Sequence, residues 1–153
     1  MENGQKVVRV QSYFTYPVDA IVLAAGAEGT STLRIESATD FIWFKSSFWA
    51  DDDPQTVDQT AATQILPSVD VQINVSGADR NLYQQPLPIP AGFGSGQIPF
   101  VLPKPMILLA NSEVRFDFVS RETTRDLRIV LALHGLKDFG EMSQGGLDRQ
   151  SQA

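Results

Sequence analysis

The stretch Val69-Asp-Val-Gln-Ile-Asn-Val75 alternates apolar and polar residues without a break. Successive side chains of an extended chain point to opposite faces, so its four apolar residues share one face and its three polar residues share the other. A period of two predicts a β-strand with one packed face and one face open to water or to a partner. The fold is therefore expected to be built around half-buried sheets.

Two later segments follow the same pattern. Residues 114–118 (VRFDF) alternate, and residues 127–133 (LRIVLAL) place Leu127, Ile129, Leu131 and Leu133 on one face. The residues between these segments, 120–126, are polar throughout. We therefore expect the two strands to form a hairpin.

Other short segments are rich in β-branched or aromatic residues and end at Pro, Gly, Asp or Ser, as strands commonly do. They are residues 7–13, 20–24, 32–36, 41–45 and 106–109, and they bring the expected strands to about eight. The sequence thus predicts an all-β fold, a two-sheet sandwich of the jelly-roll type. An immunoglobulin-type sandwich is the alternative, and it ranks second because the chain lacks the cysteine pair typical of that fold.

Three segments fall outside this pattern. Residues 51–68 are polar and acidic and are expected to form a long crossover, with a short helix near residues 56–65. Residues 85–105 are rich in proline around Gly92-Phe-Gly-Ser-Gly96, which favours an extended arm. The expected domain is a single β-sandwich with an N-terminal arm over residues 1–139, followed by a polar, flexible tail over residues 140–153.

Composition restricts the possible partners. The 153 residues carry a formal net charge of −6, which removes the general attraction that nucleic acids and anionic lipids require. No apolar run reaches the roughly 18 residues of a membrane span, and the N-terminus lacks the pattern of a signal peptide. We expect neither nucleic acid nor membrane as a partner, and the absence of cysteine suits a reducing compartment.

Residues that carry chemistry are sparse. With one histidine, His134, and no cysteine, zinc sites built on several histidines and Cys-His dyads are excluded. His134 is interpreted as an ordinary, half-exposed strand residue, and no G-x-S-x-G motif places a serine for a triad. Gly92-x-Gly94-x-Gly96 does not match a phosphate loop, and Asp51-Asp-Asp53 lacks the glycine and glutamate of an EF-hand. We therefore expect no catalytic residue, no cofactor and no metal, although a carboxylate pair for sugar hydrolysis stays open.

Aromatic residues are the unusual feature. Phe41-Ile-Trp-Phe44 continues to Phe48-Trp49, so both faces of this expected strand carry large rings. Such a strand either lies centrally, covered on both sides, or presents one face to a partner, since Trp and Tyr are enriched in binding hot spots. The candidate interface residues are Tyr13, Phe14, Tyr16, Trp43, Phe48, Trp49, Tyr83, Pro88, Pro90, Phe93 and Phe100.

A set of short phrases also points to a family. They are Leu33-Arg-Ile-Glu-Ser37 with Asp40-Phe41 and Trp43, Val71-Gln-Ile-Asn with Gly77 and Arg80-Asn-Leu82, Pro88-Ile-Pro90 with Gly92, Pro99-Phe-Val-Leu-Pro103, and Asp126-Leu-Arg-Ile129 with Leu133-His-Gly-Leu-Lys137. Over residues 30–139 the set resembles small head proteins of tailed bacteriophages that decorate or cement the capsid. The resemblance implies a β-sandwich that forms dimers or trimers and bridges neighbouring capsid subunits.

The leading hypothesis is accordingly a non-enzymatic virion protein on the capsid surface, made in the host cytoplasm. Its expected partners are the major capsid protein and itself, as a homodimer or homotrimer. The expected contacts are the proline-rich arm, residues 1–19 and the aromatics from Trp43 to Trp49, and repetition over many copies allows each to be weak. A neck or tail adaptor or a fibre base is one alternative, and a carbohydrate-binding β-sandwich is another.

Overall fold

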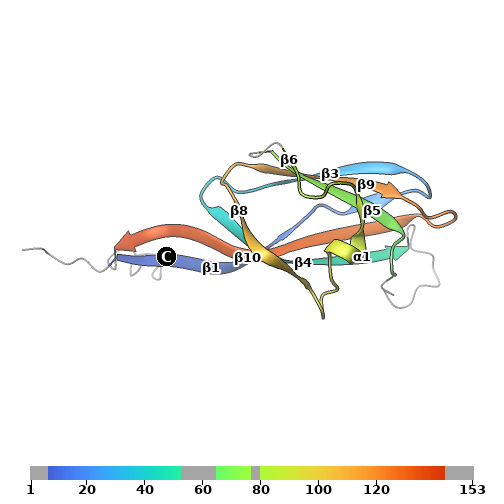
Figure 1. Ribbon diagram of the computed structural model, residues 1–153. Helices are drawn as coiled ribbons and strands as arrows, with labels where there is room; N and C mark the ends of the chain where they lie inside the picture. The colour runs from blue at the N-terminus through green and yellow to red at the C-terminus, as the bar shows by residue number, and fades with distance from the viewer. Residues whose placement is uncertain (1–6, 53–64, 77–79, 144–153) are drawn as a thin grey trace, which may run out of the picture.

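In the computed structural model, which describes residues 7–52, 65–76 and 80–143, two antiparallel sheets of five strands pack against each other (Figure 1). Sheet A has the order β1-β10-β4-β8, and β2 also pairs with β10. Its strands are β1 (Val7–Pro17), β2 (Ile21–Leu23), β4 (Asp40–Asp52), β8 (Phe100–Leu108) and β10 (Leu127–Ser143). Sheet B has the order β3-β9-β5-β6, with β7 also paired to β5. Its strands are β3 (Glu28–Arg34), β5 (Val69–Val75), β6 (Arg80–Asn81), β7 (Leu87–Pro88) and β9 (Glu113–Ser120).

The pairing order is that of a jelly roll. β1 pairs with β10, β3 with β9, β4 with β8 and β5 with β6, so the chain folds back as one long hairpin wrapped into two sheets. An immunoglobulin-type sandwich has a different strand order. The predicted all-β, two-sheet architecture is confirmed.

The predicted hairpin between residues 114–118 and 127–133 is wrong. β9 belongs to sheet B and β10 to sheet A, so the polar residues between them cross from one sheet to the other. Each strand has one apolar face, and placing the two in opposite sheets buries both faces in the same core. Alternation alone cannot distinguish neighbours within a sheet from partners across the core.

The core lies between the inner faces of the two sheets. β4 lies between β10 and β8, and its Phe41 and Trp43 are 0% and 1% exposed. Phe116 and Phe118 of β9 belong to the same buried cluster from the opposite sheet. Each of these large side chains contributes about 1.5–3 kcal/mol by leaving water. β4 is thus central within sheet A, but only its inner face is covered, and its outer face, which carries Ile42 and Trp49, is partly exposed.

A bulge in the middle of sheet A requires a glycine. His134 is paired with Lys45 and Gly135 with Trp43, so Phe44 is one extra residue on β4. A Cβ atom on Gly135 would lie 2.0 Å from the carbonyl oxygen of Ile42. Only glycine allows the two backbones to approach this closely.

The proline-rich segment does not leave the domain as an extended arm. It contains β7 and the single helical turn α1 (Ile89–Gly92), and Ile89 and Phe93 are both fully buried. It then enters β8, an edge strand of sheet A, which includes Pro103 and Pro105. Proline is tolerated there because the N–H groups of an edge are not all needed for pairing.

The expected N-terminal arm and C-terminal tail also differ from the structure. β1 is a strand of sheet A from Val7 onward, and Tyr16 and Val18 near its end are buried. β10 reaches Ser143, so residues 140–143 belong to the sheet. Residues 1–6, most of the expected crossover at 53–64 and the rest of the expected tail at 144–153 lie outside the described residues.

The far ends of β1 and β10 form a two-stranded ribbon that projects beyond the sandwich (Figure 1). β4 pairs with β10 only as far as Asp138, whereas residues 7–9 of β1 pair with residues 141–143 of β10 alone. A bulge separates this ribbon from the sheet, with Gly140 at φ 77° and its N–H donated to Asp138 Oδ1 at 3.0 Å. We call these residues the β1–β10 ribbon.

Candidate binding surface

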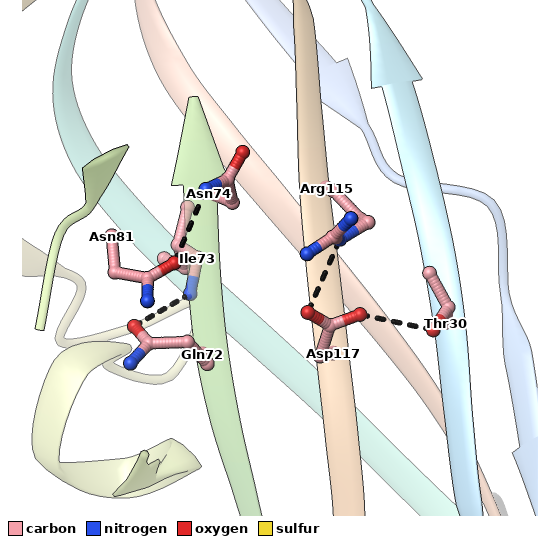
Figure 2. Close-up of polar contacts among 7 residues, drawn as sticks. All are labelled: Thr30, Gln72, Ile73, Asn74, Asn81, Arg115 and Asp117. Carbon is pink, nitrogen blue, oxygen red and sulfur yellow. Dashed lines mark hydrogen bonds and ion pairs between the residues drawn. The ribbon is translucent and has the colours of Figure 1, made fainter. Parts of the chain in front are cut away.

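The outer face of sheet B is polar (Figure 2). The Asn74 side chain donates to Asn81 Oδ1 at 3.2 Å, and Asp117 accepts from Thr30 at 3.0 Å and pairs with Arg115 at 3.2 Å. The first two contacts join neighbouring strands and the third lies within β9, and together they satisfy the polar groups while leaving them in contact with water. Around these residues the face has the character of a solvated surface, whereas Asp70 and Gln72 on the same face of β5 are buried.

The outer face of sheet A is different, because an apolar row crosses it. Tyr13, Leu136, Ile42 and Ile107 stand opposite one another on β1, β10, β4 and β8. The two ends of this row, Tyr13 and Ile107, are 66% and 62% exposed. Contiguous exposed apolar side chains are a feature of interaction sites, whereas isolated ones are ordinary.

More apolar side chains extend this surface. Val101 stands opposite Lys45 on β8 and is 58% exposed, and Val22 stands opposite Arg128 on β2 and is 55% exposed. Trp49 of β4 is partly buried on the same face. We call this set, together with the apolar row, the sheet A surface.

His134 is held beside the apolar row by three hydroxyl groups. Its Nε2 lies 2.8 Å from Ser47 Oγ, and its Nδ1 lies 3.0 Å from Thr15 Oγ1 and 3.2 Å from the Tyr13 hydroxyl. Burial, with the charge of Lys45 as a second cause, lowers the pKa of His134 below its ordinary value. The imidazole is therefore neutral near pH 7, and we assign its Nε2 as the acceptor of the Ser47 hydroxyl proton.

A serine bonded to a histidine is also the geometry of an activated nucleophile. Here Ser47 is 8% exposed, and the next backbone N–H, of Phe48, donates to the Gly94 carbonyl and is not free to bind an oxyanion. Within the described residues, the ring nitrogens of His134 bond only to hydroxyl groups. The arrangement ties β1, β4 and β10 together, and it could not be predicted from the sequence because its members come from three distant segments.

Asp51, the first residue of the acidic cluster at the start of the expected crossover, is buried and bonded to other residues of the fold. The Asp51 side chain is 3% exposed, pairs with Arg128 Nε at 3.2 Å and accepts from the Trp49 indole N–H at 3.1 Å. Asp53 lies outside the described residues. No cluster of three or more potential metal ligands occurs in the described part of the chain, and no helix described there is long and apolar enough to span a membrane.

An apolar pocket of about 310 Å³ opens at the edge of the sandwich beside β8. Tyr83 contributes a hydroxyl group, and burial raises the pKa of this residue. The Trp43 indole N–H is already donated to the Lys45 carbonyl at 2.9 Å. The lining residues are Trp43, Leu82, Tyr83, Leu87, Ala91, Gly92, Phe100, Leu102, Pro103 and Met106.

The eleven sequence candidates therefore do not form one site. Tyr16, Trp43, Phe48 and Phe93 are at most 7% exposed, and their burial places them in the core. Tyr13 and Trp49 lie on the sheet A surface, and Phe14 packs under the Lys137 ammonium group, 3.7 Å from the ring centre. Pro88 and Pro90 are exposed on sheet B and α1, while Tyr83 and Phe100 line the edge pocket.

The sequence missed the aliphatic part of the surface. The sequence alone does not mark Ile42, Leu136, Ile107 and Val101 as surface residues, because aliphatic residues in a strand ordinarily indicate the core. The signal that could have found them is an apolar residue on both faces of neighbouring strands, as in Phe41-Ile-Trp43. Only the cross-strand register brings these residues into one row.

Comparison with known proteins adds little. No family model matches the chain, and no curated protein matches it. Among solved structures, dimeric latent PorU from Porphyromonas gingivalis is similar with a TM-score of 0.37 and 9% identity. This similarity covers 85% of the present chain and 13% of the PorU chain, and it carries no inference about fold or function.

Proposed function

We propose that this protein is a non-enzymatic structural protein of a tailed-phage virion that binds the major capsid protein through the sheet A surface. The observation that carries the proposal is the contrast between the two outer faces. Sheet B presents polar groups that bond to one another, whereas sheet A presents Tyr13, Ile107, Val101 and Val22, each more than half exposed. An exposed apolar surface of this kind gains stability when a protein partner covers it.

The assignment to a virion rests on the sequence resemblance described above. A jelly roll with one apolar outer face is compatible with cementing, because a shell repeats the same contact many times. A single contact can then be weak while the assembled shell is strongly stabilised.

Binding to capsids purified without this protein tests the proposal. Ile107→Lys should weaken binding by about 2 kcal/mol, or about 30-fold in Kd, because the row loses an aliphatic side chain that the partner would cover and gains a charge. Thr32→Lys, an exposed change on β3 in sheet B, is the matched control and should bind like the wild type. Equal binding by the two variants would refute the sheet A surface as the docking site.

Copy number separates decoration from the alternative place at the neck or tail. A decoration protein is present in hundreds of copies per particle, whereas a symmetric neck ring holds about a dozen. Quantitative mass analysis of purified virions gives this number directly. Absence from the particle would remove the virion assignment altogether.

In the described part of the chain, the candidate place for the carbohydrate-binding alternative is the edge pocket, where Tyr83 and Phe100 offer aromatic rings. Sugar hydroxyl groups also need polar partners, and the pocket lining offers one side-chain hydroxyl and no carboxylate or amide side chain. Titration of Trp43 fluorescence with glycans in a Trp49→Phe variant examines this pocket alone. Saturable quenching would favour sugar binding over capsid assembly.

A further inference from the structure

Most edges of the two sheets carry features that prevent pairing with another chain. β8 has Pro103, Lys104 and Pro105 in the middle of the strand. β6 and β7 are two residues long, and β3 has charged residues at both ends. Proline, charge and shortness are the usual protections of an exposed strand edge.

The edge formed by β1 lacks these protections. β1 is 11 residues long, has no proline before its last residue, Pro17, and carries one charged residue, Arg9. Among the described residues, β1 pairs with β10 on one side and no strand pairs with its other side. The rest of β1 is mostly β-branched and aromatic, the composition that favours strand pairing.

We propose that the free edge of β1 pairs antiparallel with β1 of a second copy, joining two sheets A into one continuous sheet with two-fold symmetry. Such an interface is self-complementary and closes after two subunits. This pairing rests on the geometry of the edge and does not depend on capsid binding.

The register follows from length and charge. Full overlap of the 11 residues places Ser12 opposite Ser12 of the second copy, on the two-fold axis. Arg9 then stands opposite Thr15 of the second copy, so no like charges meet. Alternation keeps residues of the same face opposite each other in this register.

This register also accounts for the projecting β1–β10 ribbon. A two-stranded ribbon is marginally stable in water, and three or more strands are needed for independent stability. In the dimer, the order β10-β1-β1-β10 supplies two further strands. Val10, next to the ribbon, stands opposite the partly exposed Phe14 of the second copy, and pairs of aromatic and β-branched residues stabilise neighbouring strands.

The absence of cysteine makes a direct test possible. Directly opposed residues of antiparallel strands have Cα atoms about 4.5–5.5 Å apart, within the range that a disulfide spans. Ser12→Cys should therefore give a covalent dimer in nearly all molecules under mild oxidation. Ser37→Cys, on an exposed loop serine, is the matched control and should link only through slow random collisions.

Mixed variants test the register. Gln11 stands opposite Tyr13 of the second copy, so Gln11→Cys mixed with Tyr13→Cys should give a heterodimer faster than either variant links to itself. A preference for self-linked products would contradict the proposed register.

Sedimentation equilibrium tests the dimer without cross-linking. The wild type should sediment as a dimer, and Ser12→Lys should raise the dimer dissociation constant at least about tenfold, because two ammonium groups meet on the axis. Ser12 is exposed in the single chain, so the circular dichroism spectrum should not change, and Ser37→Lys should remain dimeric. A wild type that is monomeric, or a dimer or trimer unaffected by Ser12→Lys, would overturn the proposal.

The two proposals can fail separately. Ser12→Lys tests self-pairing, whereas Ile107→Lys tests the sheet A surface at the opposite edge of the same sheet. Taken with the proposed function, the dimer directs both sheet A surfaces to the same side, because the two-fold axis is perpendicular to the joined sheet. Such an arrangement would engage a repetitive surface at two points.

Discussion

Replacing Gly135 by alanine adds only one methyl group, but it should destabilise the fold strongly. The new Cβ would lie 2.0 Å from the Ile42 carbonyl oxygen and 2.8 Å from Cζ of Phe41, a ring that is 0% exposed. A non-bonded carbon needs about 3.5–4.0 Å, so the backbones of β10 and β4 must separate by more than one ångström at the bulge.

The cost has two parts and one offset. Distorting a packed core costs about 1–3 kcal/mol, and weakening two ladder hydrogen bonds costs about 0.5–1.5 kcal/mol each. Alanine restricts the unfolded chain and returns about 0.4–1 kcal/mol. We therefore expect Gly135→Ala to lower the free energy of unfolding by about 2–4 kcal/mol, a large share of the 5–15 kcal/mol of a typical domain.

Urea unfolding followed by circular dichroism measures this change. Gly96→Ala is the matched control, because no atom lies within 4 Å of its ideal Cβ position and its φ is not positive. The control should stay within about 0.5 kcal/mol of the wild type. A Gly135→Ala protein as stable as the control would refute the argument from close backbone approach.

Three further changes should have distinct outcomes. Trp43→Ala should cost about 3–5 kcal/mol by calorimetry, because it empties a site that is 1% exposed, whereas Tyr13→Ala should cost much less. Arg128→Met should cost about 1–3 kcal/mol in urea unfolding, because it leaves the buried Asp51 carboxylate without its cation; an unchanged midpoint would contradict this. Because the pKa of His134 is lowered in the folded state, the unfolded state binds more protons just below pH 6.5. The free energy of unfolding should therefore decrease as the pH is lowered through that window, and it should decrease less in His134→Gln. Parallel pH profiles of the two proteins would contradict this prediction.

Alternation predicted the class of fold well because burial of one face per strand is a local property of the sequence. The segment at Val69–Val75 became β5 with the expected bounds, but its polar face is not open as predicted: Asp70 and Gln72 are buried, because they bond to Arg121 and to the Tyr83 carbonyl. The other predicted strands all occur, several of them longer than expected. β4 continues to Asp52 because its buried polar residues have partners: Ser47 and Asp51 bond to His134 and Arg128 of β10, and Ser46 accepts from the indole N–H of Trp43 on β4 itself. Polar residues of this kind look like a strand end when only the sequence is considered.

The surface was harder to predict than the fold. Trp43 and Phe48 were reasonable interface candidates because large rings occur on both faces of their strand, but the sandwich buries them. The exposed members of the sheet A surface, such as Ile107 and Val101, have no local signature that separates them from core residues. The partners of His134 come from segments more than 80 residues away, so the network depends on topology.

The proline-containing part of β8 has one more consequence. Between the pairs formed by Trp43 with Met106 and Lys45 with Val101, β4 has one residue and β8 has four. Pro103, Lys104 and Pro105 are exposed in this excursion, and the paired residues on either side of it anchor β8 to β4 independently. A foreign peptide inserted beside Lys104 would extend a loop without shifting the register of either half, which makes this position a natural point for displaying an epitope or a label.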